Sequence, residues 1–296
     1  MRVLDAHHHF WSLTEVRHGW VAERGVQRFF GDPTPIQTDY LPEHLVREAN
    51  GVVDLVGSVH VQVGVAEGAE VDETAWLARL AERTGLPSAA VAFADLTRPD
   101  LESVLDRHCA YGVVRGIRHI VGRRADEDAA RGTDALLRDP NFKRGLSRLA
   151  ERGLSFDLQA RFDQLDACAR LLEETPALDV ALCHLGSPWD RSETGRAVWL
   201  SGVKRLAANP RIRIKLSGFG MIFGPWRADD VWPYVADALE AFGAHRAMFG
   251  SNHPVDTLRQ PAASTWAEAM RLSTRLSEDE KRAVFENTAR EFYRLG

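Results

Sequence analysis

The sequence predicts an α/β fold, a single (β/α)8 TIM barrel over residues 1–296 with a long first βα loop. Eight short apolar runs, rich in β-branched residues, alternate with longer amphipathic stretches, a pattern typical of βαβ units and a parallel sheet. Eight such units in 296 residues suit a closed barrel. An open doubly wound sheet would carry a glycine-rich phosphate turn after its first strand, whereas Asp5-Ala6-His7-His8-His9 stands there.

The predicted strands are residues 3–9, 55–63, 89–94, 113–120, 155–160, 179–184, 211–216 and 246–250. Helical periodicity predicts helices at 72–84, 144–152, 161–174, 229–242 and 277–294. The last helix opens with Ser277-Glu278-Asp279-Glu280, a capping-box signature. Residues 11–43 are weakly periodic but rich in aromatic side chains, which predict an ordered first βα loop on the face where barrels carry active sites.

Composition excludes several classes of protein. The formal net charge of −5, from 37 basic and 42 acidic residues, offers no bulk attraction to nucleic acid or to an anionic membrane. Cys109, Cys168 and Cys183 lack CxxC spacing, so neither a disulfide framework nor a thiolate zinc site is indicated. With no signal-peptide pattern and no long apolar run, we expect a cytoplasmic protein that acts on a small molecule. Symmetric association is common, and a homo-oligomer stays open.

Polar residues gather where the predicted strands end. Side chains alternate along a strand, so His7 and His9 share one face while His8 points away. Two imidazoles in this position can bind one metal ion or hold one substrate oxygen; the spacing equally allows a partly exposed loop start. His184 follows the sixth strand, and Asn252 follows the eighth. Further hydrogen-bonding residues at strand ends are Gln62, Arg118, His119, Gln159 and Lys215.

Five ordered motifs resemble the amidohydrolase superfamily: Asp5-x-His7-x-His9-Phe10-Trp11, Arg115-Gly116-Ile117-Arg118-His119, His184-Leu185-Gly186-x-Pro188, Lys215-Leu216-Ser217-Gly218 and Phe249-Gly250-Ser251-Asn252-x-Pro254-Val255. Within it, the chain is similar to the branch of fuconolactonase-like, rhamnonolactonase-like and pyrone-dicarboxylate-lactonase-like proteins. The resemblance spans almost the whole chain and implies hydrolysis of a lactone of a sugar acid or of a related carboxylated ring, in the barrel mouth.

The resemblance also implies roles for individual residues. His7, His9 and His184 would surround one divalent metal ion, zinc if present, or would contact the substrate carbonyl directly. Arg118 would recognise a carboxylate of an anionic substrate or polarise an oxygen, since a guanidinium suits bidentate contact. His119, Gln62, Gln159 and Lys215 would bind substrate. Alternatively, these polar residues bond one another inside the barrel, and Lys215 pairs with a carboxylate.

One position departs from the superfamily pattern. The usual aspartate at the end of strand 8, which binds metal and accepts a proton, is replaced by Asn252. A carboxamide is not a base at neutral pH, and a neutral ligand weakens metal binding. His9, His184 or Asp256 then accepts the proton from a metal-bound water, or the histidines act on a reactive lactone without metal, or the barrel binds a small acid without turnover.

Three further alternatives stay open at this stage. His253 is another candidate base, although a surface loop histidine is the simpler reading of its position, and Asp256 equally suits a helix N-cap. A non-oxidative decarboxylase of the same superfamily is the rival enzyme. It would be expected to need a firmly bound metal and the strand-8 aspartate, so Asn252 argues against it.

Overall fold

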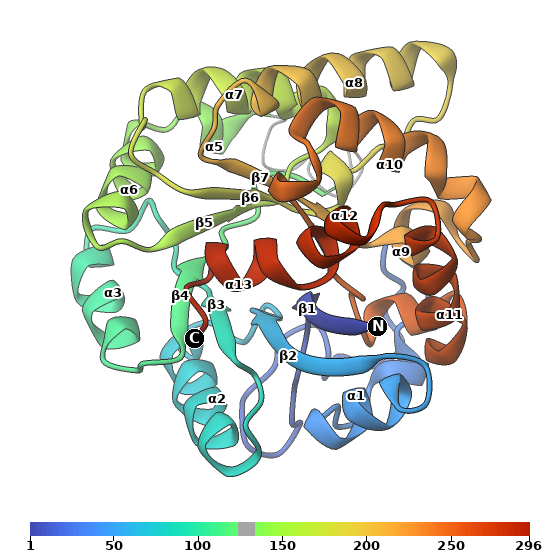
Figure 1. Ribbon diagram of the computed structural model, residues 1–296. Helices are drawn as coiled ribbons and strands as arrows, with labels where there is room; N and C mark the ends of the chain where they lie inside the picture. The colour runs from blue at the N-terminus through green and yellow to red at the C-terminus, as the bar shows by residue number, and fades with distance from the viewer. Residues whose placement is uncertain (124–133) are drawn as a thin grey trace.

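The computed structural model describes residues 1–123 and 134–296 and confirms the barrel (Figure 1). Eight parallel strands lie in the order β1-β2-β3-β4-β5-β6-β7-β8, each paired with the next. They are β1 (Arg2–His8), β2 (Asp54–Val61), β3 (Ala89–Ala92), β4 (Val114–Ile117), β5 (Ser155–Leu158), β6 (Val180–Leu182), β7 (Ile212–Leu216) and β8 (Ala247–Phe249). All eight predicted strands are present, with ends shifted by a few residues.

The strands β1 and β8 meet where the ring closes. The backbone N–H of Asn252 donates to the His7 carbonyl at 2.7 Å, and the backbone N–H of His9 donates to the His253 carbonyl at 2.8 Å. Asp5 reinforces the closure, because its carboxylate accepts from the Ser251 hydroxyl at 2.6 Å and from the Ser251 N–H at 2.9 Å. These bonds fix the position of the segment after β8 relative to the histidines of β1.

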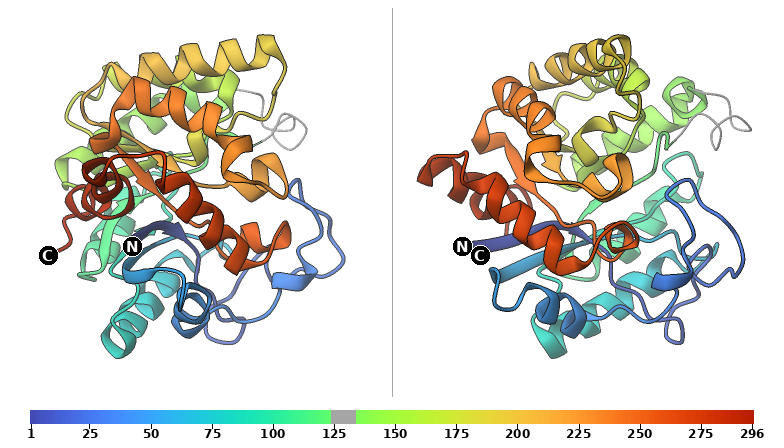
Figure 2. Two further views of the ribbon diagram at one scale, coloured as in Figure 1. Left: turned by 45° about the vertical axis from the view of Figure 1, so that its right-hand side comes forward. Right: turned by 90° about the vertical axis from the view of Figure 1, so that its right-hand side faces the viewer.

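Helices surround the barrel on its outer side (Figure 2). They are α1 (Pro42–Ala49), α2 (Glu70–Thr84), α3 (Leu101–Cys109), α5 (Ala135–Arg138), α6 (Pro140–Glu151), α7 (Leu165–Glu173), α8 (Glu193–Ala207), α9 (Phe219–Phe223), α10 (Ala228–Phe242), α11 (Ala262–Ser273), α12 (Glu278–Arg282) and α13 (Thr288–Phe292). The predicted helix 277–294 is α12 and α13 joined by a π-helical turn over Ala283–Asn287. Its capping box is confirmed, since Glu280 N–H donates to Ser277 Oγ at 3.3 Å. No helix of the described residues is long and apolar enough to cross a membrane.

The two ends of the barrel are closed differently. The segment α13 crosses the N-terminal end, near both chain termini (Figure 1), and its Phe292 and the following Tyr293 pack on the apolar residues inside the barrel. At the other end runs the long loop between β1 and α1 (Figure 2). Trp11 and Tyr40 tie its two ends together with backbone hydrogen bonds of 3.0 and 2.9 Å. The loop is ordered, as its aromatic residues predict.

Candidate active site

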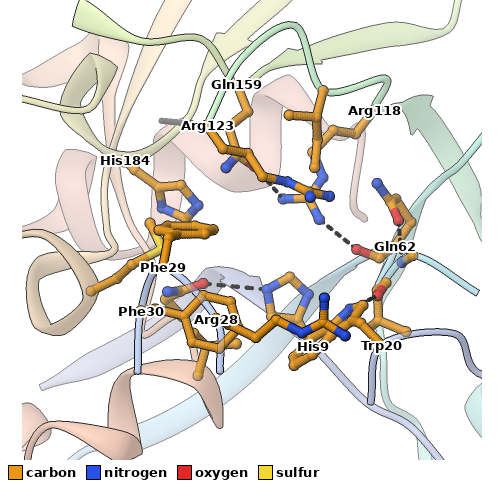
Figure 3. A pocket seen from close by; sticks show the side chains of 16 residues that line it. His9, Trp20, Arg28, Phe29, Phe30, Gln62, Arg118, Arg123, Gln159 and His184 are labelled. Atoms are coloured by element: carbon orange, nitrogen blue, oxygen red, sulfur yellow. Dashed lines mark hydrogen bonds between the residues drawn. The ribbon is translucent and has the colours of Figure 1, made fainter. Parts of the chain in front are cut away.

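A cavity of about 370 Å³ lies at the C-terminal ends of the strands, where Figure 3 shows its side chains converging. Six of the residues predicted from the sequence line it: His9, Gln62, Arg118, Gln159, His184 and Asn252. The other lining residues are Trp20, Arg28, Phe29, Phe30, Val63, Gly64, Ile120, Arg123, Met221 and Val255. The lining residues include three arginines, Arg28, Arg118 and Arg123, and none of these sixteen described residues is acidic. The wall of the cavity is therefore positively charged.

His9 and Asn252 present two acceptors to the same point. His9 Nδ1 lies 2.6 Å from the Val61 carbonyl, which can only accept, so Nδ1 carries the proton and Nε2 is a lone pair. Asn252 Oδ1 lies 3.3 Å from that Nε2. The Asn252 Nδ2 donates to Asp256 Oδ1 at 2.8 Å, which fixes the amide with its oxygen toward His9. Two acceptors this close repel each other, and a donor or cation that contacts both would relieve the repulsion.

His7 lies directly behind the cavity wall and is fully buried. Its ring centroid is 5.2 Å from that of His9 and 4.4 Å from that of His184. Both His7 ring nitrogens are buried, and neither has a hydrogen-bond partner among the described residues. Burial holds the pKa values of His7 and His9 well below the usual range, so both imidazoles are neutral at pH 7.

His184 occupies a strained backbone position beside β7. Its φ of +53° is unusual for a residue with a side chain, and its Nδ1 lies 3.0 Å from Ser217 Oγ. Gly218 permits this approach, because a Cβ there would stand 2.6 Å from His184 Nδ1. Burial lowers the pKa of His184 well below its usual range, and its ring faces the cavity (Figure 3). Strain of this kind is typical of functional sites.

The donor set fits a divalent metal ion. His7, His9 and His184 are neutral imidazoles, His9 has the fixed tautomer of a metal ligand, and His7 has no other partner in the described chain. A different trio, His7 with Asp157 and Cys183, is the one among the described residues that brings its ligand atoms within 4.8 Å of one another.

The second trio is the poorer metal site. Asp157 already accepts from Lys215 Nζ at 2.5 Å and from the Tyr293 hydroxyl at 3.0 Å. Burial raises the pKa of the Cys183 thiol to about 12, so no thiolate is present at neutral pH. The three histidines are therefore the residues that would hold an ion.

Arg118 is a buried cation that contacts only neutral groups in the described structure. Arg118 is the residue directly after β4, and it is 5% exposed. Its Nη1 donates to Gln159 Oε1 at 3.0 Å and its Nη2 to the Gln62 carbonyl at 2.5 Å, while Nε has no described partner. Burial lowers the pKa of Arg118, but a guanidinium stays charged in proteins. A charge buried without a counterion is costly, so Arg118 is a group that can bind an anion.

Two residues predicted to bind substrate lie away from the cavity. His119 follows Arg118 in an extended segment and so points to the opposite side, where its ring packs on Phe93 and Phe142, each with centroids 5.6 Å apart. Lys215 is fully buried beneath the cavity, bound to Asp157 and to the Ala6 carbonyl. The expectation that they line the pocket is therefore corrected, and for Lys215 the alternative of a carboxylate pair is the observed one.

The two other candidate bases are also buried outside the cavity lining. His253 is not a surface residue: it is fully buried, with Nδ1 at 3.1 Å from Glu48 Oε2 and its ring against Trp266. Asp256 accepts from the N–H groups of Gly220 at 2.7 Å and Met221 at 3.0 Å. Asp256 therefore caps the short helix α9 and holds Asn252, while burial raises its pKa to about 6.

The sequence placed the first loop on the active-site face, but its individual cavity residues were not identified as binding residues. Trp20, Phe29 and Phe30 were expected to order the loop, and they also face the cavity, together with Arg28. The sequence Arg28-Phe29-Phe30, an arginine followed by two aromatic residues in a loop, is the signal that was available. Asp5 was also missed, although its place two residues before His7 lets it accept from the His7 N–H at 3.1 Å.

Comparisons with known proteins identify similar sequences and structures. The amidohydrolase family model matches residues 4–295. An uncharacterized protein of Sinorhizobium fredii is 33% identical over 99% of this chain and 98% of its own length. The L-fucono-1,5-lactonase of Burkholderia multivorans is 31% identical over 99% of this chain and 96% of its own length. A zinc-bound amidohydrolase structure from Burkholderia multivorans matches with a TM-score of 0.81 and 27% identity, covering 100% of both chains.

Proposed function

The chain belongs to the amidohydrolase family, and we propose that it is a lactonase that opens an anionic cyclic ester in the cavity at the barrel mouth. The observation that carries the proposal is the close approach, at 3.3 Å, of two acceptors, His9 Nε2 and Asn252 Oδ1, in the same cavity as the buried guanidinium of Arg118. One group of residues can orient a nucleophile, and the other can hold an anionic substrate beside it. The lactonase relative at 31% identity supports the same class of reaction.

Substrate binding follows from the unsatisfied donors. Arg118 binds a carboxylate of the substrate through the donor atoms that the chain leaves free. The side-chain oxygen of Gln159 accepts a hydrogen bond from Arg118, so the side-chain nitrogen of Gln159 is available to donate to a substrate oxygen. Because Arg118 and Gln159 are locked to each other and to the Gln62 carbonyl, they are pre-organised and lose little freedom on binding.

Water activation follows from the paired acceptors. A water that donates one hydrogen to His9 Nε2 and the other to Asn252 Oδ1 keeps a lone pair for the ester carbonyl. As the new C–O bond forms, His9 accepts the water proton, and the Val61 carbonyl stabilises the charged ring through Nδ1–H. The ring C–O bond of the ester then breaks, and the departing oxygen takes the proton from His9. The product is a hydroxy acid that releases one proton to solvent.

A divalent ion is compatible with the same residues. His7, His9 and His184 would hold it, and a zinc ion is our proposal for its identity, because the donors are imidazoles and a zinc-bound structure is among the similar ones. Such an ion supplies Lewis-acid polarisation of a carbonyl oxygen. Asp256 keeps Asn252 Oδ1 directed toward that position in either case.

The test is proton release in weak buffer across carboxylated and neutral lactones, with wild type beside His184→Ala. We expect turnover of a carboxylated lactone that falls by roughly 100-fold or more in the variant, the size typical of losing a group that acts in the transition state. Metal content is measured on the same samples. No proton release by folded wild type, with release of CO2 from aromatic carboxylates, would instead indicate a decarboxylase.

A further inference from the structure

The first βα loop brings a second arginine to the cavity. Arg28 lines the cavity with its neighbours Phe29 and Phe30, all from the segment between β1 and α1. Arg118 reaches the same cavity from the end of β4, well around the barrel from β1. Figure 3 shows Arg118 and Arg28 approaching the space from different sides. A ligand between them therefore meets a guanidinium at each end.

The backbone of this loop holds Arg28 in place. Arg28 N–H donates to the Gly31 carbonyl at 3.0 Å, and Gly31 N–H donates to the Arg28 carbonyl at 2.9 Å, which closes a tight turn. Gly31 has φ +115°, a conformation that other residues rarely adopt. The two tip residues are packed on both sides: Phe29 lies on Trp189 with centroids 5.7 Å apart, and Phe30 lies on Trp20 at 5.4 Å.

Among the described residues, the carboxylate that pairs with Arg28 is that of Glu23, on the solvent side. Its Nη2 donates to Glu23 Oε2 at 2.5 Å, and the Glu23 side chain is 56% exposed. Its Nε is buried and has no partner among the described residues. Leaving a charged donor buried without an acceptor costs free energy. The lining residues in the described chain include no carboxylate that could serve.

We propose that Arg28 is a specificity-determining residue that binds an anionic group of the substrate on the first-loop side, opposite the group bound by Arg118. The inference rests on the proposed lactonase function and narrows its substrate class to a lactone with a carboxylate at each end. Trp20, Phe29 and Phe30 cover the uncharged part of such a ring. A neutral sugar lactone offers no anionic group to either arginine, and a lactone with one carboxylate offers one to Arg118 alone.

The experiment compares Arg28→Gln with Arg17→Gln, using 2-pyrone-4,6-dicarboxylate and 2-pyrone-6-carboxylate as a matched pair of lactones. Arg17 is a control on the same loop, since its Nη2 contacts the Glu67 carbonyl at 3.4 Å and it does not line the cavity. Arg28→Gln is expected to raise KM for the dicarboxylate by roughly 10- to 100-fold, the loss typical of one hydrogen bond to a charged group. Its KM for the monocarboxylate, which has no second carboxylate for Arg28, should rise at least several-fold less than its KM for the dicarboxylate.

Binding is measured separately by titration calorimetry in a His184→Ala background, so that the test does not depend on turnover. Dicarboxylate binding that weakens with Arg28→Gln supports the inference even where no lactone is opened, in which case the lactonase proposal alone fails. Equal weakening for both lactones, or none for either, overturns the role of Arg28. Absence of dicarboxylate binding to every variant overturns it as well. Arg17→Gln is expected to match its parent throughout.

Discussion

Lys215 and Arg118 are both buried cations at strand ends, but they differ in whether a carboxylate of the protein pairs with them. Lys215, fully buried near the end of β7, donates to the Asp157 carboxylate and the Ala6 carbonyl, and the Tyr293 hydroxyl also donates to Asp157. Arg118, at the mouth, contacts neutral groups in the described chain and keeps an unpartnered Nε. The charge of Lys215 is paired within the protein, whereas that of Arg118 has no carboxylate partner among the described residues, which is why we propose that it binds a ligand.

The largest expected effect concerns the buried ion pair of Lys215 and Asp157. Lys215→Met should lower the free energy of unfolding by roughly 3–5 kcal/mol, because it leaves the Asp157 carboxylate buried without its cation. Chemical denaturation measures this. Adding Asp157→Leu should recover part of the loss, since removing both charges avoids an isolated one.

The matched control for this change is an exposed pair. Lys143→Met removes one partner of the Lys143–Glu174 ion pair, whose side chains are 43% and 56% exposed, and should cost less than about 1 kcal/mol. Equal losses for Lys143→Met and Lys215→Met would mean that the interior pair has no special structural role.

A smaller effect concerns the carboxylate that holds Asn252. Burial raises the pKa of Asp256 from 3.8 to about 6, so between these values the folded state binds more protons than the unfolded state. Stability therefore falls as pH rises from about 4 to 6, by about 3 kcal/mol for two pKa units. Asp256→Asn should flatten this part of the pH–stability curve, measured by denaturation at several pH values.

Catalysis supplies an independent test of the same residue. Because Asp256→Asn leaves one acceptor oxygen for the N–H groups of Gly220, Met221 and Asn252, the hold on Asn252 weakens, and we expect kcat to fall roughly tenfold while KM changes little. A variant with the wild-type slope of stability against pH and wild-type kcat would contradict the positioning role of Asp256.

The smallest expected effect is at His119, the neighbour of Arg118. Its ring packs on Phe93 and Phe142 and does not line the cavity, so His119→Ala should change kcat/KM by less than about threefold. The same proton-release assay measures it. A loss as large as that of an Arg118 variant would show that the alternation of side chains after β4 does not separate a binding face from a packing face.

Parts of this arrangement were predictable from sequence for a simple reason. Parallel strands in a closed barrel bring their C-terminal ends together, so polar residues such as His9, Arg118 and His184 had to meet once eight strands were recognised. The prediction failed where the neighbour of a residue decides its role. Lys215 and Arg118 look alike in sequence, and they differ because Asp157 lies beside one of them.

The remaining errors have similar causes. His253 was expected on the surface, but it packs against Glu48 of α1 and Trp266 of α11, and its own sequence neighbours do not reveal these contacts. His119 ends up outside the cavity lining because strand geometry turns alternate side chains away. Arg28 was overlooked because its loop has no periodicity from which the direction of a side chain can be read.

The most direct test of the account is to measure, for Arg118→Gln, both the rate of proton release from a carboxylated lactone and the free energy of unfolding. The account predicts that kcat/KM falls by roughly 30-fold or more, as expected for truncating one partner of a buried charged contact, while stability is unchanged or increases. Stability that drops by several kcal/mol with activity preserved in the remaining folded protein would contradict it, because Arg118 would then be a structural cation like Lys215.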